Sequence, residues 1–129
     1  MTPAPLRVLC VDDNRDAADT TAQLLAAYGV ETQARYAGEE ALAAVAVFRP
    51  DVCILDLSMP GMDGLELANR IRTAAGDDRP LLVTLTALDD YSTLEQVVDS
   101  GFDLHFTKPV EPAALLQALA DYRAHGRPA

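Results

Sequence analysis

Residues 52–71 read VCILDLSMPGMDGLELANRI and contain one complete strand–helix unit. The apolar run Val52–Leu55 is continuous rather than alternating, which is typical of a parallel strand covered on both faces. A turn region with glycine and proline follows, and apolar residues then recur at helical spacing from Leu67 to Ile71. This stretch therefore predicts a buried strand that ends at Asp56 and is followed by a helix.

The same alternation extends in both directions along the chain. Four further strands are predicted at Leu6–Val11, Glu31–Tyr36, Leu81–Leu85 and Leu104–Phe106. Residues at helical spacing between or after them are Ala18, Ala22, Leu25 and Tyr28, then Leu42, Val45 and Ala46, then Leu94, Val97 and Val98, and last Leu115, Leu116 and Leu119. Parallel strands need crossover connections, which are nearly always right-handed. We expect an α/β, flavodoxin-like, doubly wound (βα)5 fold with a five-stranded parallel sheet in the order 2-1-3-4-5.

Helix boundaries and length fit this single-domain architecture. Gly29 is expected to end the first helix, Arg49-Pro50 the second, and Pro112 to open the last. A chain of 129 residues fits one domain. We expect a single domain over 1–129, with a core at about 6–123, a short N-terminal lead and a C-terminal tail.

Composition excludes some classes of partner. The chain has 20 acidic and 10 basic side chains, and Lys108 is the only lysine beside nine arginines. A net charge of -10 disfavours binding of nucleic acid or of an anionic membrane surface. No signal peptide and no apolar run of roughly 18 residues is visible, so we expect a cytoplasmic protein. Cys10 and Cys53 lie inside apolar runs, which predicts buried free thiols.

Polar side chains follow four of the five predicted strands. Asp12 and Asp13 follow the first strand, Asp56 the third, Thr86 the fourth and Lys108 the fifth. Ligands of open α/β sheets bind at the carboxyl ends of the strands, near the point where the strand order reverses. In the order 2-1-3-4-5 these five side chains converge at one edge of the sheet.

Three carboxylates at one edge need compensation. Two of them about 4 Å apart repel by roughly 4 kcal/mol at an effective dielectric constant of about 20. A carboxylate can take up a proton, with a raised pKa, or the cluster can bind a hard cation such as Mg²⁺. No histidine or cysteine joins the cluster, which disfavours zinc.

This set of side chains also suits phosphoryl transfer. Asp56 is central and can act as a nucleophile that forms an acyl phosphate. Lys108 would pair with one phosphoryl oxygen, and Thr86 would donate a hydrogen bond to another. Each residue alone also fits a helix cap, a turn or plain surface, and only their joint placement favours a functional site.

Four sequence blocks resemble the receiver (CheY-like) domains of bacterial two-component response regulators and hybrid histidine kinases. They are Val8–Asn14, Leu55–Gly64, Leu85–Ala87 and Thr107–Pro109, and the similarity covers about Leu6 to Tyr122. The resemblance implies a phosphorelay signalling domain rather than an enzyme. Its phosphoacceptor would receive a phosphoryl group from a histidine kinase or a histidine phosphotransfer protein.

The resemblance also implies a role for each matching residue. Asp56 matches the phosphoacceptor, and the Mg²⁺ ligands would be Asp13, Asp56 and the backbone carbonyl of Ser58, with Asp12 reaching the metal through water. Thr86 and Lys108 match the pair that contacts the phosphoryl oxygens. The remaining matches are the Lys108-Pro109 bond, usually cis, and His105 at the switch position, usually Tyr or Phe.

In such a switch, phosphorylation draws Thr86 toward the phosphoryl group and turns the side chain at His105 inward. The surface of the fourth helix, the fifth strand and the fifth helix then changes, and an unidentified output partner reads it. The acyl phosphate hydrolyses slowly, and the apolar Leu88 suggests a long-lived phosphorylated state. A homodimer is possible, and the chain is either a stand-alone regulator or the receiver of a hybrid kinase.

Three other functions compete with this one. A pseudo-receiver would present its surface without phosphorylation, but the acidic set, Thr86 and Lys108 argue against it. A phosphatase of the haloacid dehalogenase type needs a second aspartate two residues beyond the nucleophile, where this chain has Ser58. A flavodoxin would place a phosphate next to Asp12 and Asp13, which would repel it.

Overall fold

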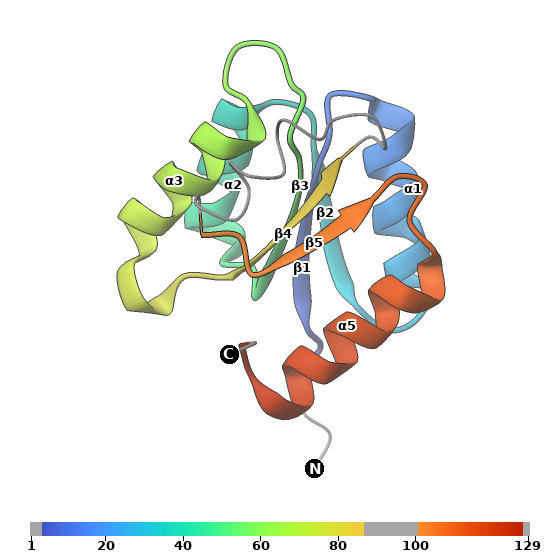
Figure 1. Ribbon diagram of the computed structural model, residues 1–129. Coiled ribbons are helices and arrows are strands. Elements are labelled where there is room, and N and C mark those ends of the chain that lie inside the picture. Colours follow the sequence, from blue (N-terminus) through green and yellow to red (C-terminus); the bar gives the residue numbers. More distant parts are fainter. Residues whose placement is uncertain (1–3, 87–100, 128–129) are drawn as a thin grey trace.

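The computed structural model describes residues 4–86 and 101–127, apart from the side chains of Asp77 and Thr86. Figure 1 shows a central sheet with helices on both sides, and element labels follow that figure. The strands are β1 (Arg7–Val11), β2 (Glu31–Arg35), β3 (Val52–Asp56), β4 (Leu81–Thr86) and β5 (Leu104–Thr107). The helices are α1 (Arg15–Ala26), α2 (Gly38–Phe48), α3 (Gly64–Ala75), the 3₁₀ turn η1 (Gly76–Asp78) and α5 (Pro112–His125).

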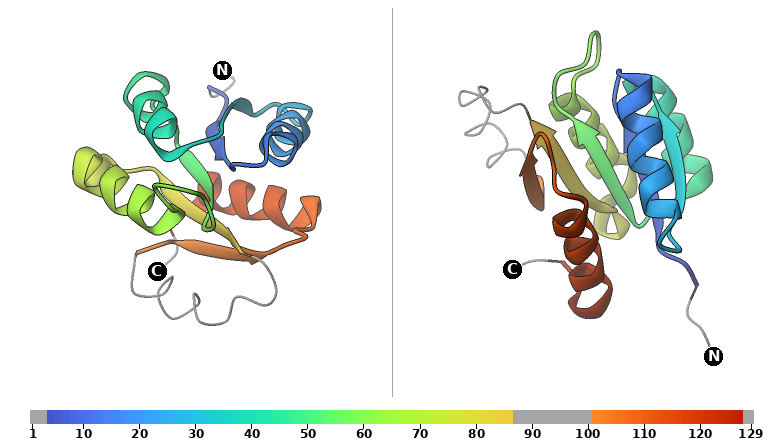
Figure 2. Two further views of the ribbon diagram at one scale, coloured as in Figure 1. Left: turned by 90° about the horizontal axis from the view of Figure 1, so that it is seen from above. Right: turned by 90° about the vertical axis from the view of Figure 1, so that its right-hand side faces the viewer.

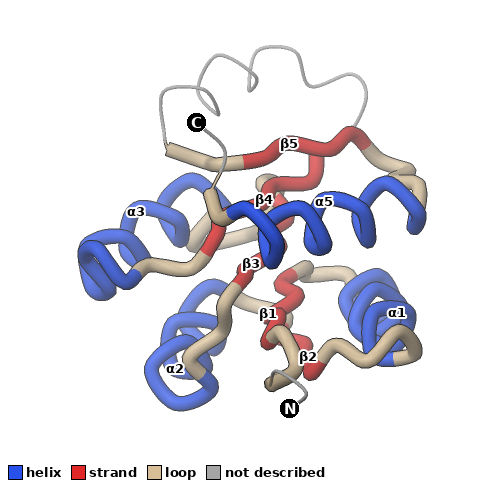
Figure 3. The backbone as a smooth tube through the Cα atoms, turned by 90° about the horizontal axis from the view of Figure 1, so that it is seen from below, coloured by secondary structure: helices blue, strands red, loops and turns tan. Residues whose placement is uncertain are grey.

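The sheet has the order β2-β1-β3-β4-β5, and its strand pairs are parallel. Helices α1 and α5 cover one face, and α2 and α3 cover the other (Figure 2, left). The same three layers are visible from the opposite end of the strands in Figure 3. The predicted flavodoxin-like fold and strand order are therefore confirmed.

The core consists of two apolar clusters, one on each face of the sheet. One cluster packs Leu9 and Leu55 against α2 and α3, and the other packs Val8 and Ile54 against α1 and α5. All five residues of β3 are buried, so this strand contributes to both clusters. Burial on both faces is the physical reason for the continuous apolar run in the sequence.

Two predicted helix faces are wrong in detail. Tyr28 lies beyond the end of α1 and is 67% exposed. In α2 the buried residues are Gly38, Ala41, Ala44 and Phe48 rather than the predicted set, because the helix presents a neighbouring stripe to the sheet. Leu42 and Val45 lie at the margin of that stripe and are half-buried, and Ala46 is exposed.

The predicted buried faces of α3 and α5 are confirmed, and one further predicted helix lies outside the described residues. Leu67, Ala68 and Ile71 are fully buried in α3, and Leu115 and Leu119 are buried in α5 while Leu116 is half-buried. Gly29 adopts a left-handed conformation three residues after α1 ends, and Pro112 occupies the first turn of α5, both as predicted. Leu94, Val97 and Val98 lie outside the described residues.

Cys10 and Cys53 are free and buried, as predicted. They belong to different core clusters, so their side chains lie on opposite faces of the sheet. Burial raises the pKa of the Cys10 thiol to about 12 and also raises that of Cys53, which keeps both thiols protonated and unreactive. Within the described part of the chain, every helix is too short or too polar to cross a membrane.

Candidate functional site

The site lies at the carboxyl ends of β1 and β3, two neighbouring strands at the centre of the sheet. Val11 pairs with Leu55, so the residues that follow them, Asp12 and Asp56, lie side by side. Asp56 is the last residue of β3 rather than the first residue after it, and the residues Asp12 and Asp56 are almost completely buried, at 5% and 6% exposure. The parallel register therefore places two acidic groups in one recess.

Asp13 completes a cluster of three carboxylates. One oxygen from each of Asp12, Asp13 and Asp56 lies within 4.8 Å of the others. Asp13 is exposed, whereas the other two are buried, so the cluster opens to solvent on the side of Asp13. The sequence predicted this convergence correctly.

Lys108 brings a positive charge to the two buried carboxylates. Its Nζ lies 3.2 Å from Asp12 Oδ2 and 3.4 Å from Asp56 Oδ1. The ammonium group reaches them from the end of β5, and the bond between Lys108 and Pro109 is cis, as the resemblance implies. The single lysine of the chain therefore contacts two of the three acidic residues.

The electrostatics of the site leave Asp56 unusually easy to protonate. Burial is the larger cause and the Asp12 carboxylate the next, and together they raise the pKa of Asp56 to about 6 although Lys108 acts to lower it. Burial acts to lower the pKa of Lys108, but Asp56 and Asp12 outweigh it and the pKa is raised. The lysine is thus firmly charged, and the cluster carries excess negative charge.

Backbone N–H groups approach the carboxylates of Asp12 and Asp56. Asp12 Oδ1 accepts a hydrogen bond from the backbone N–H of Asn14 at 3.0 Å, and Asn14 Oδ1 accepts one from Ala17 N at 3.1 Å as the N-cap of α1. The backbone N–H of Ser58 lies 3.4 Å from Asp56 Oδ1. The turn after β1 is therefore fixed by the start of α1.

The loop between β3 and α3 packs tightly against the phosphoacceptor candidate. A Cβ at Gly64 would lie 2.5 Å from the carbonyl oxygen of Asp56 and 2.8 Å from Leu57 Cα, so only glycine fits there. Gly61 has φ 76° in the turn, and Asp63 caps α3 by accepting a hydrogen bond from Glu66 N at 2.9 Å. The sequence predicted a tight turn, but it did not predict that Gly64 contacts the backbone of Asp56.

The structure does not place the side chains of the other predicted residues in the cluster. Thr86 ends β4, and its side chain lies outside the described set. His105 is half-buried in β5, paired in register with Thr84. Ser58 is exposed, and its backbone N–H is the group that approaches Asp56. Leu88 lies outside the described residues.

Sequence reasoning missed an ion pair that holds the amino end of β5. Arg79 donates two hydrogen bonds to Asp103, at 2.8 and 3.0 Å, and Asp103 Oδ2 also accepts one from the backbone N–H of Leu82 at 2.8 Å. The carboxylate thereby raises the pKa of Arg79. This contact links the start of β4 to the start of β5, the strand that leads to Lys108.

A hollow of about 590 Å³ adjoins the cluster between α1 and the segment after β5. Asp12 and Lys108 line its inner end, and Ala17, Thr21 and Pro109 line its walls. An approaching group can therefore reach Asp12 and Lys108 from the side of α1.

The donor chemistry fits a hard divalent cation. The three carboxylates offer only oxygen ligands, and Mg²⁺ favours one or two carboxylates together with retained waters. A bound cation would also offset the repulsion between the Asp12 and Asp56 carboxylates, which helps to raise the pKa of Asp56. An exposed cation beside a nucleophilic carboxylate and a fixed ammonium group is an arrangement suited to phosphoryl transfer.

Comparison with known proteins identifies the family of this chain. The model of the response regulator receiver domain matches residues 8–120. The response regulator MprA of Mycolicibacterium vanbaalenii is 40% identical over 120 residues, which are 93% of this chain and 50% of that protein. This chain therefore spans about half the length of the curated relatives that it matches.

Solved structures agree with this match. A putative response regulator from Chloroflexus aurantiacus superposes with a TM-score of 0.85 at 30% identity, covering 94% of this chain and 99% of that one. The Vibrio cholerae chemotaxis protein CheY4 superposes with a TM-score of 0.83 at 29% identity, covering 91% and 98%. Both coverages are close to complete, so the similarity extends to the whole fold.

Proposed function

The chain belongs to the family of response regulator receiver domains, and from this premise we propose that it is a phosphoacceptor switch of a two-component or phosphorelay system. Asp56 receives the phosphoryl group from a phosphohistidine, and Mg²⁺ bound by the acidic cluster assists. The observation that carries this proposal is the contact of Lys108 with both buried carboxylates, Asp12 and Asp56, of a three-carboxylate cluster that is exposed at Asp13.

Asp56 is the nucleophile because it is the carboxylate that Lys108 and the Ser58 amide both approach. One carboxylate oxygen attacks phosphorus and the P–N bond of the phosphohistidine breaks. The ring carries a proton on its other nitrogen before transfer, so the bonding electrons return to the ring and the imidazole leaves as the neutral base. The attacking form is the ionised carboxylate, which predominates above the pKa of about 6. Lys108 neutralises charge on the transferring group without having to move far.

Asp12, Asp13 and Asp56, with the backbone carbonyl of Ser58, are the ligands we propose for the metal. Bound Mg²⁺ supplies positive charge to the phosphoryl oxygens. The chain's contribution is to hold three oxygen donors within 4.8 Å and to leave one side, at Asp13, open to solvent. Asp12 is additionally held by Asn14 N and by Lys108, which suits a ligand that acts through a water molecule.

The phosphorylated state then changes the surface on the β5 side of the sheet. The phosphoryl group adds negative charge and acceptor oxygens next to Lys108, and Thr86 at the end of β4 follows as the second contact. His105, two strand positions before Thr107, changes its side-chain position, and the face formed by β5, α5 and the preceding connection is read by an output partner. Slow hydrolysis of the acyl phosphate returns the domain to its resting state.

The phosphate donor is a histidine kinase or a histidine phosphotransfer protein. The hollow between α1 and Pro109 is lined by Lys108 and Asp12, and Lys108 also contacts Asp56, so a donor histidine can approach the cluster from there. A signalling role also suits the residue two positions beyond Asp56, since Ser58 cannot serve as the general acid that a phosphatase of the dehalogenase type needs. The cytoplasmic location, the single-domain extent over 1–129 and a possible homodimer remain predictions.

The test is phosphorylation from a small donor. The protein is incubated with acetyl phosphate and Mg²⁺, and intact-mass spectrometry measures the gain of one phosphoryl group. We expect the gain in the wild type and in Asp51→Asn, a control aspartate at the far end of β3, and no gain in Asp56→Asn. An unmodified wild type, or equal modification of Asp56→Asn, would show that the domain is a pseudo-receiver or uses another acceptor.

A further inference from the structure

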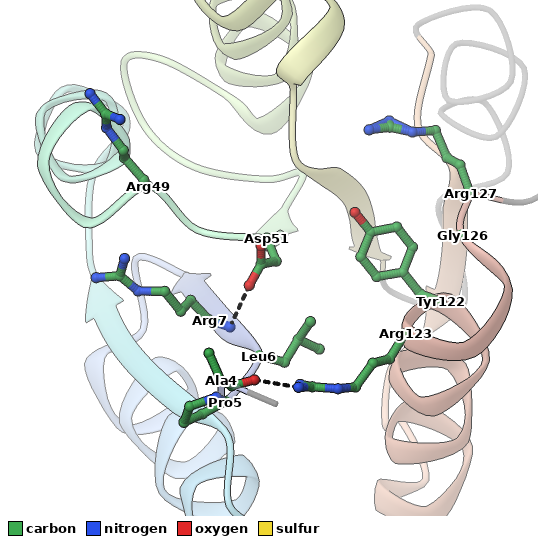
Figure 4. A pocket seen from close by; sticks show the side chains of 10 residues that line it. All are labelled: Ala4, Pro5, Leu6, Arg7, Arg49, Asp51, Tyr122, Arg123, Gly126 and Arg127. Atoms are coloured by element: carbon green, nitrogen blue, oxygen red, sulfur yellow. Dashed lines mark hydrogen bonds between the residues drawn. The ribbon is translucent and has the colours of Figure 1, made fainter. Parts of the chain in front are cut away.

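A second pocket lies at the amino ends of the strands, at the opposite edge of the sheet from Asp56. It has a volume of about 650 Å³ and is bounded by the segment before β1, the α2–β3 connection and the end of α5 (Figure 4). Four of its ten lining residues are the arginines Arg7, Arg49, Arg123 and Arg127, and the acidic one is Asp51. The ten lining residues therefore carry a net charge of +3 in a chain whose net charge is -10, although Glu31, outside the lining, pairs with Arg7 Nε at 3.4 Å and offsets part of it.

Three of these guanidinium groups are held in place by the fold. Arg123 donates a hydrogen bond to the carbonyl oxygen of Ala4, and Arg127 donates one to the carbonyl oxygen of Arg79 at 2.5 Å. The guanidinium carbon of Arg7 lies 4.6 Å from the centre of the Phe48 ring. A ligand would therefore meet side chains that have already lost much of their conformational freedom, which favours binding.

The fourth arginine occupies a position that usually suits glycine. Arg49 is the C-cap of α2 with φ 51° and ψ 64°. Among the described residues, the other positions with a positive φ are all glycines. The left-handed conformation costs a residue with a Cβ roughly 1 kcal/mol or more. Such an outlier at the rim of a pocket is a reason to look for a function of its side chain.

The arrangement of the charges indicates the shape of the ligand. In Figure 4 Arg7 and Arg49 extend their guanidinium groups toward the outer edge of one side of the pocket, away from Asp51, and Arg123 and Arg127 reach in from the side of α5. Asp51 lies between them, where its Oδ2 accepts a hydrogen bond from the backbone N–H of Arg7 at 2.9 Å. A single small anion would contact only one side, whereas an elongated one with several charges can contact both.

We propose that this pocket binds an oligophosphate anion, either as a free chain of linked phosphates or as the phosphate chain of a nucleotide. Planar guanidinium groups pair with phosphate oxygens in a bidentate way, and the volume is within the range of small-molecule sites. A long nucleic acid is disfavoured because the chain as a whole repels it. The site is separate from the acidic cluster and does not depend on phosphorylation of Asp56.

Binding is measured by calorimetry and by backbone amide NMR in buffer freed of divalent metal with a chelating resin, since a soluble chelator is itself a polyanion. The probes are tripolyphosphate, ATP, inorganic phosphate and adenosine. We expect tripolyphosphate to bind, to shift amide signals around Leu6, Asp51 and Tyr122, and to bind more weakly as salt rises. Equal affinity for ATP identifies the phosphate chain as the ligand, and tighter binding of ATP identifies a nucleotide. The proposal is wrong if tripolyphosphate does not bind or shifts signals elsewhere.

Matched variants separate a built site from the general field of the protein. Arg49→Gln and Arg127→Gln should each weaken tripolyphosphate binding by about threefold to tenfold. Arg70→Gln, which removes the same charge from the exposed face of α3, should leave it unchanged. Asp51→Asn should strengthen binding, and Glu39→Gln on α2 should not. Equal effects in the pocket and control variants would overturn the proposal. Asp56→Asn should bind normally, so failure here and failure of phosphoacceptor activity are distinguishable.

Discussion

Asp56 is costly to the folded protein as long as no cation is bound. Its side chain is 9% exposed, lies beside Asp12, and receives only partial compensation from Lys108 and from the Ser58 amide. A residue whose charge destabilises the fold and serves the chemistry is typical of a functional site. The following two predictions test this conflict.

Asp56→Asn should stabilise the metal-free protein at pH 7.5. Burial raises the pKa of Asp56 from 3.8 to about 6, so the folded state favours the neutral form. The stabilising contribution of protonation is complete below pH 3.8 and is lost as pH rises through about 6. We expect the variant to gain about 1–2 kcal/mol in free energy of unfolding in urea at pH 7.5, and little at pH 4. A less stable variant at pH 7.5 would contradict the electrostatic account.

Lys108→Ala should raise the pKa of Asp56 further, because the ammonium group acts to lower it. We expect the pKa of Asp56 to rise by about one unit. Carbon NMR of the side-chain carboxylates as a function of pH measures this shift. The variant should also lose phosphorylation by acetyl phosphate. An unchanged pKa would mean that the 3.4 Å contact between Lys108 and Asp56 is electrostatically unimportant.

At the scale of elements, the β3–α3 connection is the most constrained part of the site. The helix begins directly against the strand it follows, with Gly64 N donating to Leu57 O at 3.0 Å. Asp63 caps α3, and two apolar residues of the loop itself, Leu57 and Met62, are buried. The loop therefore transmits the position of α3 to the backbone of Asp56.

Gly64→Ala should destabilise the protein by about 1–3 kcal/mol, because its Cβ would clash with the backbone at Asp56 and Leu57 rather than with a movable side chain. Gly76→Ala is the control, since it has φ 61° and open space around the added Cβ. It should cost a comparable amount, about 1–2 kcal/mol, from the left-handed backbone conformation, so phosphorylation is the measurement that separates the two variants. Denaturation with urea measures both variants, and phosphorylation should be slowed in Gly64→Ala alone. Normal phosphorylation of that variant would show that the close approach does not position Asp56.

Much of the fold and the site could be predicted from the sequence, for a definite physical reason. Strands buried on both faces give continuous apolar runs, and parallel pairing forces their carboxyl ends to one edge, so Asp12, Asp56 and Lys108 had to converge. The buried face of α2 was predicted wrongly because the helix is rich in alanine and its mixture of small and apolar residues leaves several faces acceptable. The ion pair of Arg79 and Asp103 joins two segments that are neither helix nor strand. Such segments have no periodic sequence pattern, so the contact could not be predicted.

At the scale of the whole molecule, Mg²⁺ should act as a stabilising ligand. Because the cluster exists in the folded state, binding raises the free energy of unfolding by mass action, by about 2.7 kcal/mol at a hundredfold excess over Kd. We expect an upward shift of Tm with Mg²⁺, reversed by EDTA and strongly reduced in Asp13→Asn. Glu39→Gln, an exposed acid on α2, is the matched control. The same shift in Asp13→Asn would place the cation elsewhere.

The two free cysteines lie in separate layers of the molecule, one on each side of the sheet. Neither is accessible unless its own layer opens, and the raised pKa values keep background reaction slow. Each cysteine is therefore a natural probe for the opening of its own layer. Timed alkylation, read at Cys53 and at Cys10, reports how often the α2–α3 layer and the α1–α5 layer separate from the sheet, without any engineered label.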